Sequence, residues 1–527
     1  MKNQNYPLYK PPVISSISDM LEKKALKSPE GSAFRFRKGR DHIEEKTYGD
    51  VCLEVRKTAS LVEQQYGRGS HIAIIGENSY EWMIAFFSVL CSGNVAVPID
   101  KELPAAEVAW MIDHADVTAA FVSKTYSDLV ENIDGLSVMT LKELQKAGEE
   151  GDSDYQLYHP QDDELASIFF TSGTTGKPKG VMLSHGNLAY ETVGPARLFH
   201  PEGFTTLSVL PYHHEFGLNV AVLMAYNYGV SIFLNKSLKR VKEDLMIAKP
   251  VILMLVPMFT EVFYKQIMDG IKKSGREKKV RQGIRLSNLL LKFGIDKRRT
   301  FFSEIIDEFG GELKYIISGG AHLDTFYVKA FRDFGIEVLN GYGASELSPC
   351  VAINRNYYKR DGSVGPAIPG MDVRTTPDGE VQFKGPATMM GYYKNPEATE
   401  EVIQDGWYST GDLGYVDKDG FIFLTGRKKN LIILSNGENI SPEELENDYS
   451  IDPGVCEVLV YAQDEMLVAA IYPEEEYRGN TAYFDELTEK INQNRPMYKQ
   501  ISRVVLRDEE FIKNTSQKIV RYKNIPD

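Results

Sequence analysis

The stretch Thr171–Leu188, TSGTTGKPKGVMLSHGNL, concentrates residues that could bind an anion. It follows an apolar run, residues 165–170, that is typical of a β-strand. Glycines expose backbone N–H groups, and the hydroxyl and ammonium groups add further donors, so this loop could hold phosphates. It is not the P-loop of NTPases, because only two residues separate its first glycines and Pro178 follows the first lysine. Taken alone, it could also be an ordinary turn.

Five further segments carry polar residues in comparable patterns. They are LPYHHEFG (210–217), ISGGAHL (317–323), NGYGASE (340–346), GWYSTGDLGYVDKDGFIFLTGRKKN (406–430) and NTSQKIVR (514–521). Together with TSGTTGKPKG (171–180), and in this order, they resemble the motifs of the adenylate-forming (AMP-binding) superfamily. That superfamily includes acyl-CoA synthetases, peptide-synthetase adenylation domains and firefly luciferase. The resemblance covers nearly the whole chain.

The resemblance implies a two-step reaction. A carboxylate attacks the α-phosphorus of ATP to give an acyl-adenylate and pyrophosphate, and a thiol then takes the acyl group and releases AMP. Negative charge builds at phosphorus, so cations and oriented donors are the main catalytic device, and no protein nucleophile is required. The implied cofactors are ATP, Mg²⁺ and CoA, or the phosphopantetheine arm of a carrier protein in place of CoA.

The family motifs also imply which residues bind ATP and AMP. They are Thr171, Ser172, Gly173, Thr174, Thr175, Gly176, Lys179, Gly319, Gly320, Ala321, Asn340, Gly341, Tyr342, Gly343, Ala344, Ser345, Asp412 and Arg427. Residues 319–321 and 341–343 each end a strand-like run, so two glycine loops are expected to clamp the adenine while Tyr342 stacks on it. Asp412 would accept hydrogen bonds from the ribose hydroxyls, and Arg427 would contact the ribose or a phosphate.

By the same resemblance, Lys518 is the catalytic cation that bridges the substrate carboxylate and the α-phosphate. His214 matches the histidine near the carboxylate, although His213 beside it leaves the register open and a packed aromatic ring is the alternative. Glu346 is the expected Mg²⁺ ligand, with Thr171 as a second oxygen donor. Lys429 matches the hinge of the family. Gly437, Glu438 and Asn439 would line the thiol tunnel of a second conformation.

These residues need a scaffold, and the chain alternates apolar β-rich runs with helical patterns. HIAIIG (71–76), a helix over 77–91 and AAFVS (119–123) show the βαβ rhythm of an α/β protein. With the resemblance, this predicts a large N-terminal domain, residues 1–428, of βαβ-type sheets with helices on both faces. A small mobile α+β lid, residues 429–527, would follow, with a capping box at Ser441–Glu444.

The composition limits the classes of binding partner and the cellular compartment that are expected. A net charge of −14 argues against a nucleic-acid binder, and four scattered cysteines fit a reducing compartment with buried thiols. The first residues lack a secretory signal, and residues 82–99 suggest a helix, a turn and a strand rather than a membrane span, so a cytoplasmic protein is expected.

Residues 265–299 hold twelve Lys and Arg against three Asp and Glu. This segment could contact an anionic membrane peripherally, or could be a solvated helical face.

Three functions remain open at this point. Residues 265–299 and the closing run over 498–511 resemble the long-chain fatty acyl-CoA synthetase branch, which favours a fatty acid:CoA ligase. A stand-alone adenylating enzyme that loads an acyl or aminoacyl group onto a carrier protein is the second possibility. The third is a non-catalytic nucleotide- or acyl-binding protein, and its only support is that Gln517 and Ile512 stand where the family often has Gly and Pro.

Overall fold

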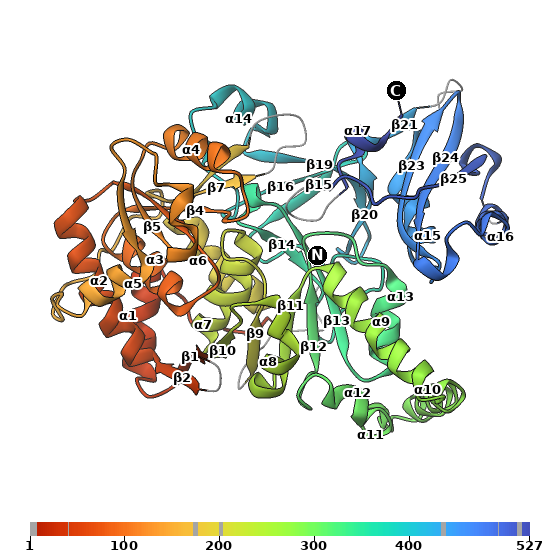
Figure 1. Cartoon of the computed structure of the whole chain (residues 1–527), viewed down its shortest axis with the longest axis horizontal. Coiled ribbons are helices and arrows are strands. Elements are labelled where there is room, and N and C mark those ends of the chain that lie inside the picture. Colours follow the sequence, from red (N-terminus) through yellow and green to blue (C-terminus); the bar gives the residue numbers. More distant parts are fainter. Residues whose placement is uncertain are drawn as a thin grey trace.

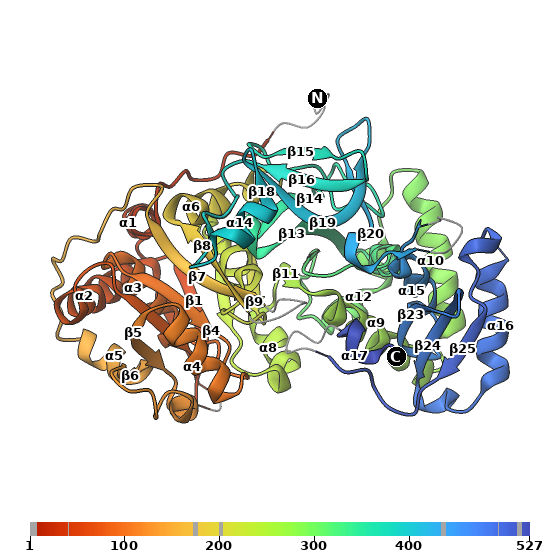
Figure 2. The ribbon, with the colours of Figure 1, turned by 90° about the horizontal axis from the view of Figure 1, so that it is seen from above.

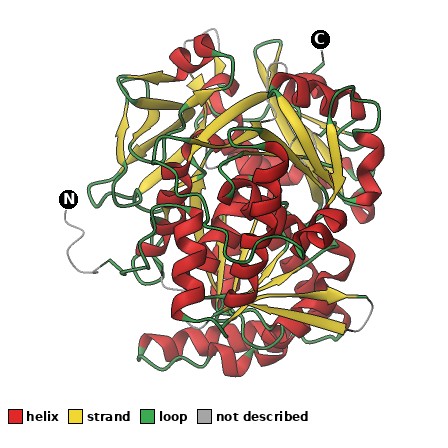
Figure 3. Ribbon diagram, turned by 90° about the vertical axis from the view of Figure 1, so that its left-hand side faces the viewer, coloured by secondary structure: helices red, strands yellow, loops and turns green. Residues whose placement is uncertain are grey.

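The computed structural model describes residues 8–39, 42–171, 178–199, 204–433, 439–493, 495–513 and 519–526. Its two large sheets have eight and seven strands, and sheets of five, three and two strands complete the described part. Figure 1 follows the chain from the N-terminal helices at one end to the C-terminal sheet at the other, and Figure 3 shows how helices cover the sheets. The prediction of an α/β fold is confirmed.

The seven-stranded sheet has the order β17-β8-β7-β4-β3-β5-β6. Its strands are β3 (His71–Ile75), β4 (Val95–Ile99), β5 (Val117–Val122), β6 (Ser137–Thr140), β7 (Leu165–Thr171), β8 (Lys179–Ser184) and β17 (Gly391–Tyr392). The associated helices are α1 (Ile17–Lys27), α2 (Tyr48–Tyr66), α3 (Tyr80–Cys91), α4 (Ala105–His114), α5 (Leu141–Gly148) and α6 (His185–Val193). Strands β3 to β7 run parallel, whereas β8 returns antiparallel to β7. The expected helix, turn and strand over 82–99 are α3 and β4, and α3 begins at Tyr80 because Ser79 caps it.

The eight-stranded sheet has the order β14-β13-β12-β11-β9-β10-β1-β2. Its strands are β1 (Ser32–Lys38), β2 (His42–Thr47), β9 (Thr205–Ser208), β10 (Ser231–Leu234), β11 (Ile252–Leu255), β12 (Tyr315–Ser318), β13 (Glu337–Gly343) and β14 (Cys350–Ile353). Helices α7 (Ala225–Tyr228), α8 (Val241–Ala248), α9 (Pro257–Lys273), α10 (Glu277–Lys292), α11 (Arg298–Phe301), α12 (Ser303–Asp307) and α13 (Thr325–Asp333) belong to this part of the chain. Because β11, β12 and β13 are parallel, their carboxyl ends meet at one edge, where ligands bind in such sheets.

Two helices, α6 and η3 (Phe216–Met224), join the large sheets. Helix α6 contacts β7 and β8, and it also contacts η3, which in turn contacts β9 and β11 of the other sheet. η3 buries eight of its nine residues, and α6 contributes Leu188 and Ala189 to the same continuous apolar core. The two sheets are therefore held as one packed body, and the loops at their edges face a common region.

The five-stranded sheet contains β15 (Asp372–Thr375), β16 (Glu380–Lys384), β18 (Ile403–Gln404), β19 (Trp407–Val416) and β20 (Ile422–Arg427), with α14 (Pro396–Val402) alongside. The chain then continues through β21 (Ile432–Ile433), β22 (Asn439–Ile440), α15 (Pro442–Ser450), β23 (Val455–Gln463), β24 (Met466–Pro473), α16 (Thr481–Asn492), β25 (Arg503–Leu506) and α17 (Arg521–Asn524). These last elements bury an apolar core of their own. This fits a separate lid, although the boundary at 428/429 remains a prediction.

Two local expectations need correction. Ser441 does precede α15, with Pro442 at its first position, but its hydroxyl donates to Glu443 and does not cap the helix, so no capping box forms. Cys456 is exposed because it lies on the outer side of β23, whereas the other three cysteines are buried. Among the described residues, no helix is both long enough and apolar enough to span a membrane.

Candidate active site

The glycine-rich segment is held at both ends by a β-hairpin. Thr171 ends β7, Lys179 begins β8, and the two residues are paired across the antiparallel strands. The Thr171 hydroxyl donates to the carbonyl oxygen of Lys179 over 3.4 Å. The residues between the strands that the sequence assigned to ATP lie outside the described part of the chain: Ser172, Gly173, Thr174, Thr175 and Gly176.

Glu346 lies beside this hairpin. It belongs to the short helix η5 (Ser345–Leu347), and its Oε1 accepts a hydrogen bond of 2.7 Å from the Tyr392 hydroxyl. Lys179 Nζ lies 4.6 Å from the centroid of the same tyrosine ring. Burial, together with the Glu346 carboxylate, raises the pKa of Tyr392, so its phenol stays a donor at neutral pH. Tyr392 thereby connects the lysine of the hairpin to the candidate metal ligand, a role that no sequence motif assigned to it.

Glu346 carries a carboxylate, the hard oxygen donor that suits Mg²⁺. The ion is usually held by one or two protein oxygens, with phosphate oxygens and water completing the shell. Among the described residues, no cluster of three or more His, Cys, Asp or Glu forms a self-contained metal cage. A carboxylate at Glu346 and a hydroxyl at Thr171 therefore fit an ion that would arrive with a nucleotide.

Glu215 is a buried acid that sequence reasoning missed. It is 4% exposed, and its Oε2 accepts a hydrogen bond of 2.9 Å from the Ser345 hydroxyl. Its other oxygen is buried without a hydrogen-bond partner among the described residues. Burial raises the pKa of Glu215 to about 7, and the nearby charge of Glu346 adds to the rise. The available signal was a carboxyl residue inside the otherwise apolar and aromatic LPYHHEFG motif.

The first expected adenine loop follows β12 as predicted. Ser318, the last residue of this strand, is paired with Asn340 of the parallel strand β13, so the two glycine segments start side by side. Gly320 has φ +84°, a left-handed conformation that favours glycine. A Cβ on Gly319 would lie 3.2 Å from the ring of Phe216. Ala321, which follows, is exposed.

The second expected adenine loop is instead part of a strand. Gly341, Tyr342 and Gly343 continue β13 and pair antiparallel with β14. The segment that leads into β14 comes very close to β13 at this point. A Cβ on Gly343 would lie 1.4 Å from the carbonyl oxygen of Pro349. Only glycine fits there. Ala344 ends this strand region and precedes η5.

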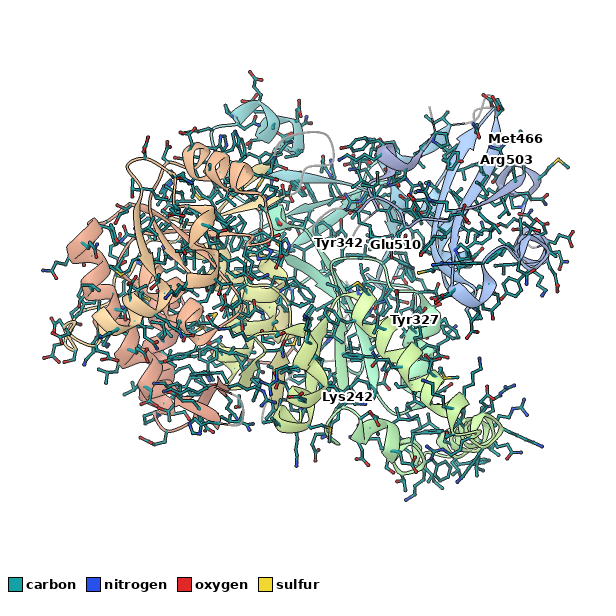
Figure 4. The ribbon with its side chains drawn as sticks, in the orientation of Figure 1. Lys242, Tyr327, Tyr342, Met466, Arg503 and Glu510 are labelled. Carbon is teal, nitrogen blue, oxygen red and sulfur yellow. The ribbon has the colours of Figure 1, made fainter. Side chains whose placement is uncertain are left out.

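Asp412 joins Tyr342 to Arg427. The Tyr342 hydroxyl donates to Asp412 Oδ2 over 2.5 Å, and Arg427 Nε lies 2.7 Å from Asp412 Oδ1. The arginine stands opposite Asp412 because β19 and β20 pair at these two residues. Burial and the Asp412 charge hold the pKa of Tyr342 well above its usual range. Figure 4 shows Tyr342 near the middle of the molecule. Three predicted nucleotide residues are therefore in direct contact.

Lys428, next to Arg427, is also paired. Its ammonium lies 3.0 Å from Glu380 Oε2 and 2.7 Å from Asp378 Oδ2. Glu380 in turn accepts a hydrogen bond of 2.9 Å from the backbone N–H of Gly411. These contacts anchor the chain just before the predicted hinge.

The two histidines lie between β9 and η3, with ring centroids 4.4 Å apart. His213 Nε2 is 3.5 Å from Asp100 Oδ2, at the end of β4. Burial, with smaller contributions from His214 and Lys101, lowers the pKa of His213 well below its usual range, so this ring is neutral near pH 7. His214 is half-buried beside it. The structure thus leaves the choice between the two histidines open.

The predicted hinge follows β20 directly. Lys429 lies in the short helix η6 (Lys428–Asn430), and burial lowers its pKa, with Arg427 adding to the effect. Asn430 donates to Glu443 of α15 over 2.5 Å. Asn439 begins β22, whereas Gly437, Glu438 and the catalytic candidate Lys518 lie outside the described residues.

Comparison with known proteins identifies the family. Residues 21–393 match the family described as AMP-binding enzyme. The chain belongs to this family. The recognition made from the six motifs is therefore confirmed, and with it the prediction of an enzyme of the AMP-forming ligase class.

Its curated relatives include two acyl-CoA ligases. The chain is 29% identical to the long-chain-fatty-acid–CoA ligase FadD15 of Mycobacterium bovis over 461 residues, which cover 81% of this chain and 76% of the relative. It is 28% identical to long chain acyl-CoA synthetase 3 of Arabidopsis thaliana, over 81% of this chain and 73% of that protein.

Solved structures share the fold of this AMP-binding enzyme. The o-succinylbenzoate CoA synthetase MenE of Bacillus subtilis, in complex with its acyl-adenylate intermediate, has a TM-score of 0.76 at 23% identity and covers 96% of this chain and 97% of its own. ATP-bound MatB of Rhodopseudomonas palustris has a TM-score of 0.77 at 24% identity, with 97% of each chain covered.

Proposed function

We propose that this AMP-binding enzyme is an ATP-dependent fatty acyl-CoA synthetase. It would convert a long-chain fatty acid to an acyl-adenylate with release of pyrophosphate, and then to a thioester with release of AMP. The observation that carries the proposal is the chain of contacts from Lys179 through Tyr392 to Glu346. It brings a cation from the glycine-rich hairpin and a candidate metal ligand to one place, as a reaction at phosphorus requires.

The hairpin and Glu346 would receive the triphosphate. Lys179 would lie over the phosphates from the start of β8, while Thr171 and Glu346 would hold Mg²⁺. The bound ion would supply neutralisation of phosphate charge. Tyr392 would orient the Glu346 carboxylate by donating to one of its oxygens, which leaves the other available.

The base and sugar would lie toward Tyr342 and Asp412. Both oxygens of Asp412 already have protein partners, and since a carboxylate oxygen can accept more than one hydrogen bond, Asp412 would also accept from a ribose hydroxyl. Asn340 Oδ1 is buried without a hydrogen-bond partner among the described residues. An acceptor held in this way suits the exocyclic amino group of adenine. The Tyr342 ring and the glycines at 319 and 341 would bound the base.

The acid would enter beside the histidine pair. The neutral imidazole of His213 could donate to the substrate carboxylate without adding a charge, and His214 beside it is the alternative donor. Lys518 would bridge that carboxylate and the α-phosphate once the lid closes, and Lys429 would be the hinge of this closure. Rotation of the lid about Lys429 would then bring residues 437–439 to the thiol channel.

The names of the relatives support a fatty acid as the acid and CoA as the thiol. Pyrophosphate release should be measured over a series of acids from acetate to palmitate, with aryl and amino acids included and with and without CoA. The proposal expects a maximum at long aliphatic acids and a large increase with CoA. If the activity does not depend on CoA but responds to an acyl carrier protein, the acceptor is the carrier protein and not CoA. If no acid of the series causes release of pyrophosphate, the proposal is refuted.

A further inference from the structure

The outer face of α10 has no partner within the described structure. Helix α9 ends at Lys273 and α10 begins at Glu277, so the two helices form a hairpin, which contacts α11 and α13. Figure 1 places α10 at the lower margin of the molecule, away from the central position that Figure 4, in the same orientation, gives Tyr342; Figures 1 and 2 both show it far from α2 and α5. The exposed surface of α10 therefore does not border the candidate active site.

One face of α10 is fixed against the protein. Ser287 is fully buried, and a Cβ on Gly283 would lie 3.3 Å from the ring of Phe302. Asn288 donates to Asp333 of α13 over 2.9 Å. Because this side of the helix packs on the body, the opposite side must point outward.

Large apolar side chains lie on the outward side. Leu286 is 50% exposed, Leu289 is 52% exposed and Phe293, just after the helix, is 74% exposed. Their spacing of three and four residues places them in one stripe along the helix. Such a stripe of leucine and phenylalanine in water is unfavourable unless something covers it.

A row of cations runs beside the stripe. Lys278, Arg281, Arg285 and Lys292 follow the same helical spacing, next to the apolar side chains, and all four are exposed. No carboxylate among the described residues pairs with any of them. By contrast, Arg276, just before the helix, forms an ion pair with Glu304. The row is thus a cluster of uncompensated positive charge on a protein whose net charge is −14.

We propose that this outer face of α10 binds the surface of an anionic lipid bilayer, with Leu286, Leu289 and Phe293 entering the headgroup region. The adjacent cations would contact lipid phosphates, as in helices that lie in a membrane interface. A bilayer accepts protruding apolar side chains without a complementary pocket, which an acidic protein partner would have to supply. The overall negative charge would repel an anionic surface elsewhere, so this face sets the orientation of the bound protein.

Binding of this face to a membrane would add to the proposed function but does not depend on it. The test measures binding of the protein to vesicles without ATP or a carboxylic acid. The full chain would be floated with vesicles of equal parts phosphatidylcholine and phosphatidylglycerol at low salt, and with vesicles of phosphatidylcholine alone. A charge variant replaces the row: Lys278→Gln, Arg281→Gln, Arg285→Gln and Lys292→Gln. Its matched control replaces four exposed lysines on the side of α1 and α5: Lys27→Gln, Lys124→Gln, Lys142→Gln and Lys146→Gln.

Removal of the four cations should lower partitioning into anionic vesicles on the order of a hundredfold. The variant Leu286→Ser/Leu289→Ser should lower it about tenfold, while Leu26→Ser/Leu53→Ser, two exposed leucines at the other end, should not. Circular dichroism verifies that each variant is folded. Equal flotation of the charge variant and its control would overturn the proposal. So would unchanged flotation together with lost binding to an acidic acyl carrier protein, since the face would then dock a protein.

Discussion

Replacing Glu215 by glutamine should stabilise the protein above neutral pH, because the native structure keeps this carboxyl group away from water. Burial raises the pKa of Glu215 from 4.5 to about 7. A rise of about 2.5 units, at about 1.36 kcal/mol per unit, corresponds to about 3 kcal/mol in the free energy of unfolding. The side chain is 4% exposed, so solvent screens little of this effect.

The direction of the change in the free energy of unfolding depends on whether the folded or the unfolded state keeps the proton of Glu215. Well below pH 4.5 the carboxyl is protonated in both states, so wild type and Glu215→Gln should be about equally stable. As the pH rises, the unfolded state loses its proton first, and the free energy of unfolding of the wild type falls until about pH 7. Glutamine cannot ionise, and its oxygen can still accept from Ser345. The variant should therefore lack this fall.

Urea unfolding of both proteins at about pH 5 and about pH 8, without nucleotide or metal, measures the difference. Intrinsic tryptophan fluorescence, to which the buried Trp82 of α3 contributes, reports the transition. The advantage of the variant should grow by roughly 2–3 kcal/mol between these pH values. Glu397→Gln, on the exposed first turn of α14, is the control and should show no such growth. A variant whose advantage stays constant with pH would refute the argument from burial.

Three further variants test the site. Lys518→Ala should slow acid-dependent pyrophosphate release on the order of a hundredfold or more, while thioester formation from preformed acyl-adenylate continues; unimpaired adenylation would remove this lysine from the mechanism. Lys429→Pro should spare adenylation and damage thioester formation, and equal damage to both steps would argue against a hinge. Tyr392→Phe keeps the ring near Lys179 but removes the hydrogen bond to Glu346, so KM for ATP should rise about tenfold. An unchanged KM for ATP would mean that the hydrogen bond from Tyr392 to Glu346 does not contribute to nucleotide binding.

Much of the scaffold could be predicted because its signals are local. The apolar run over 165–170 became β7, and the interrupted apolar stretch over 82–99 became α3 and β4. Period and turn chemistry act within a few residues, so they can be recognised in a single sequence. The prediction was wrong at Gly341–Gly343, where three residues typical of a loop continue β13. Their pairing depends on β14, which the local pattern does not contain.

The sequence by itself determined the family, through six motifs in one order, and the residue types that chemistry at phosphorus needs. Only the tertiary structure decided which of them meet. Tyr342 and Asp412 are 70 positions apart, and Ser345 and Glu215 are 130 apart, yet each pair is hydrogen-bonded. The raised pKa of Glu215 has the same origin, because desolvation depends on the segments that pack around a side chain. Distant segments create that environment only when the chain is folded.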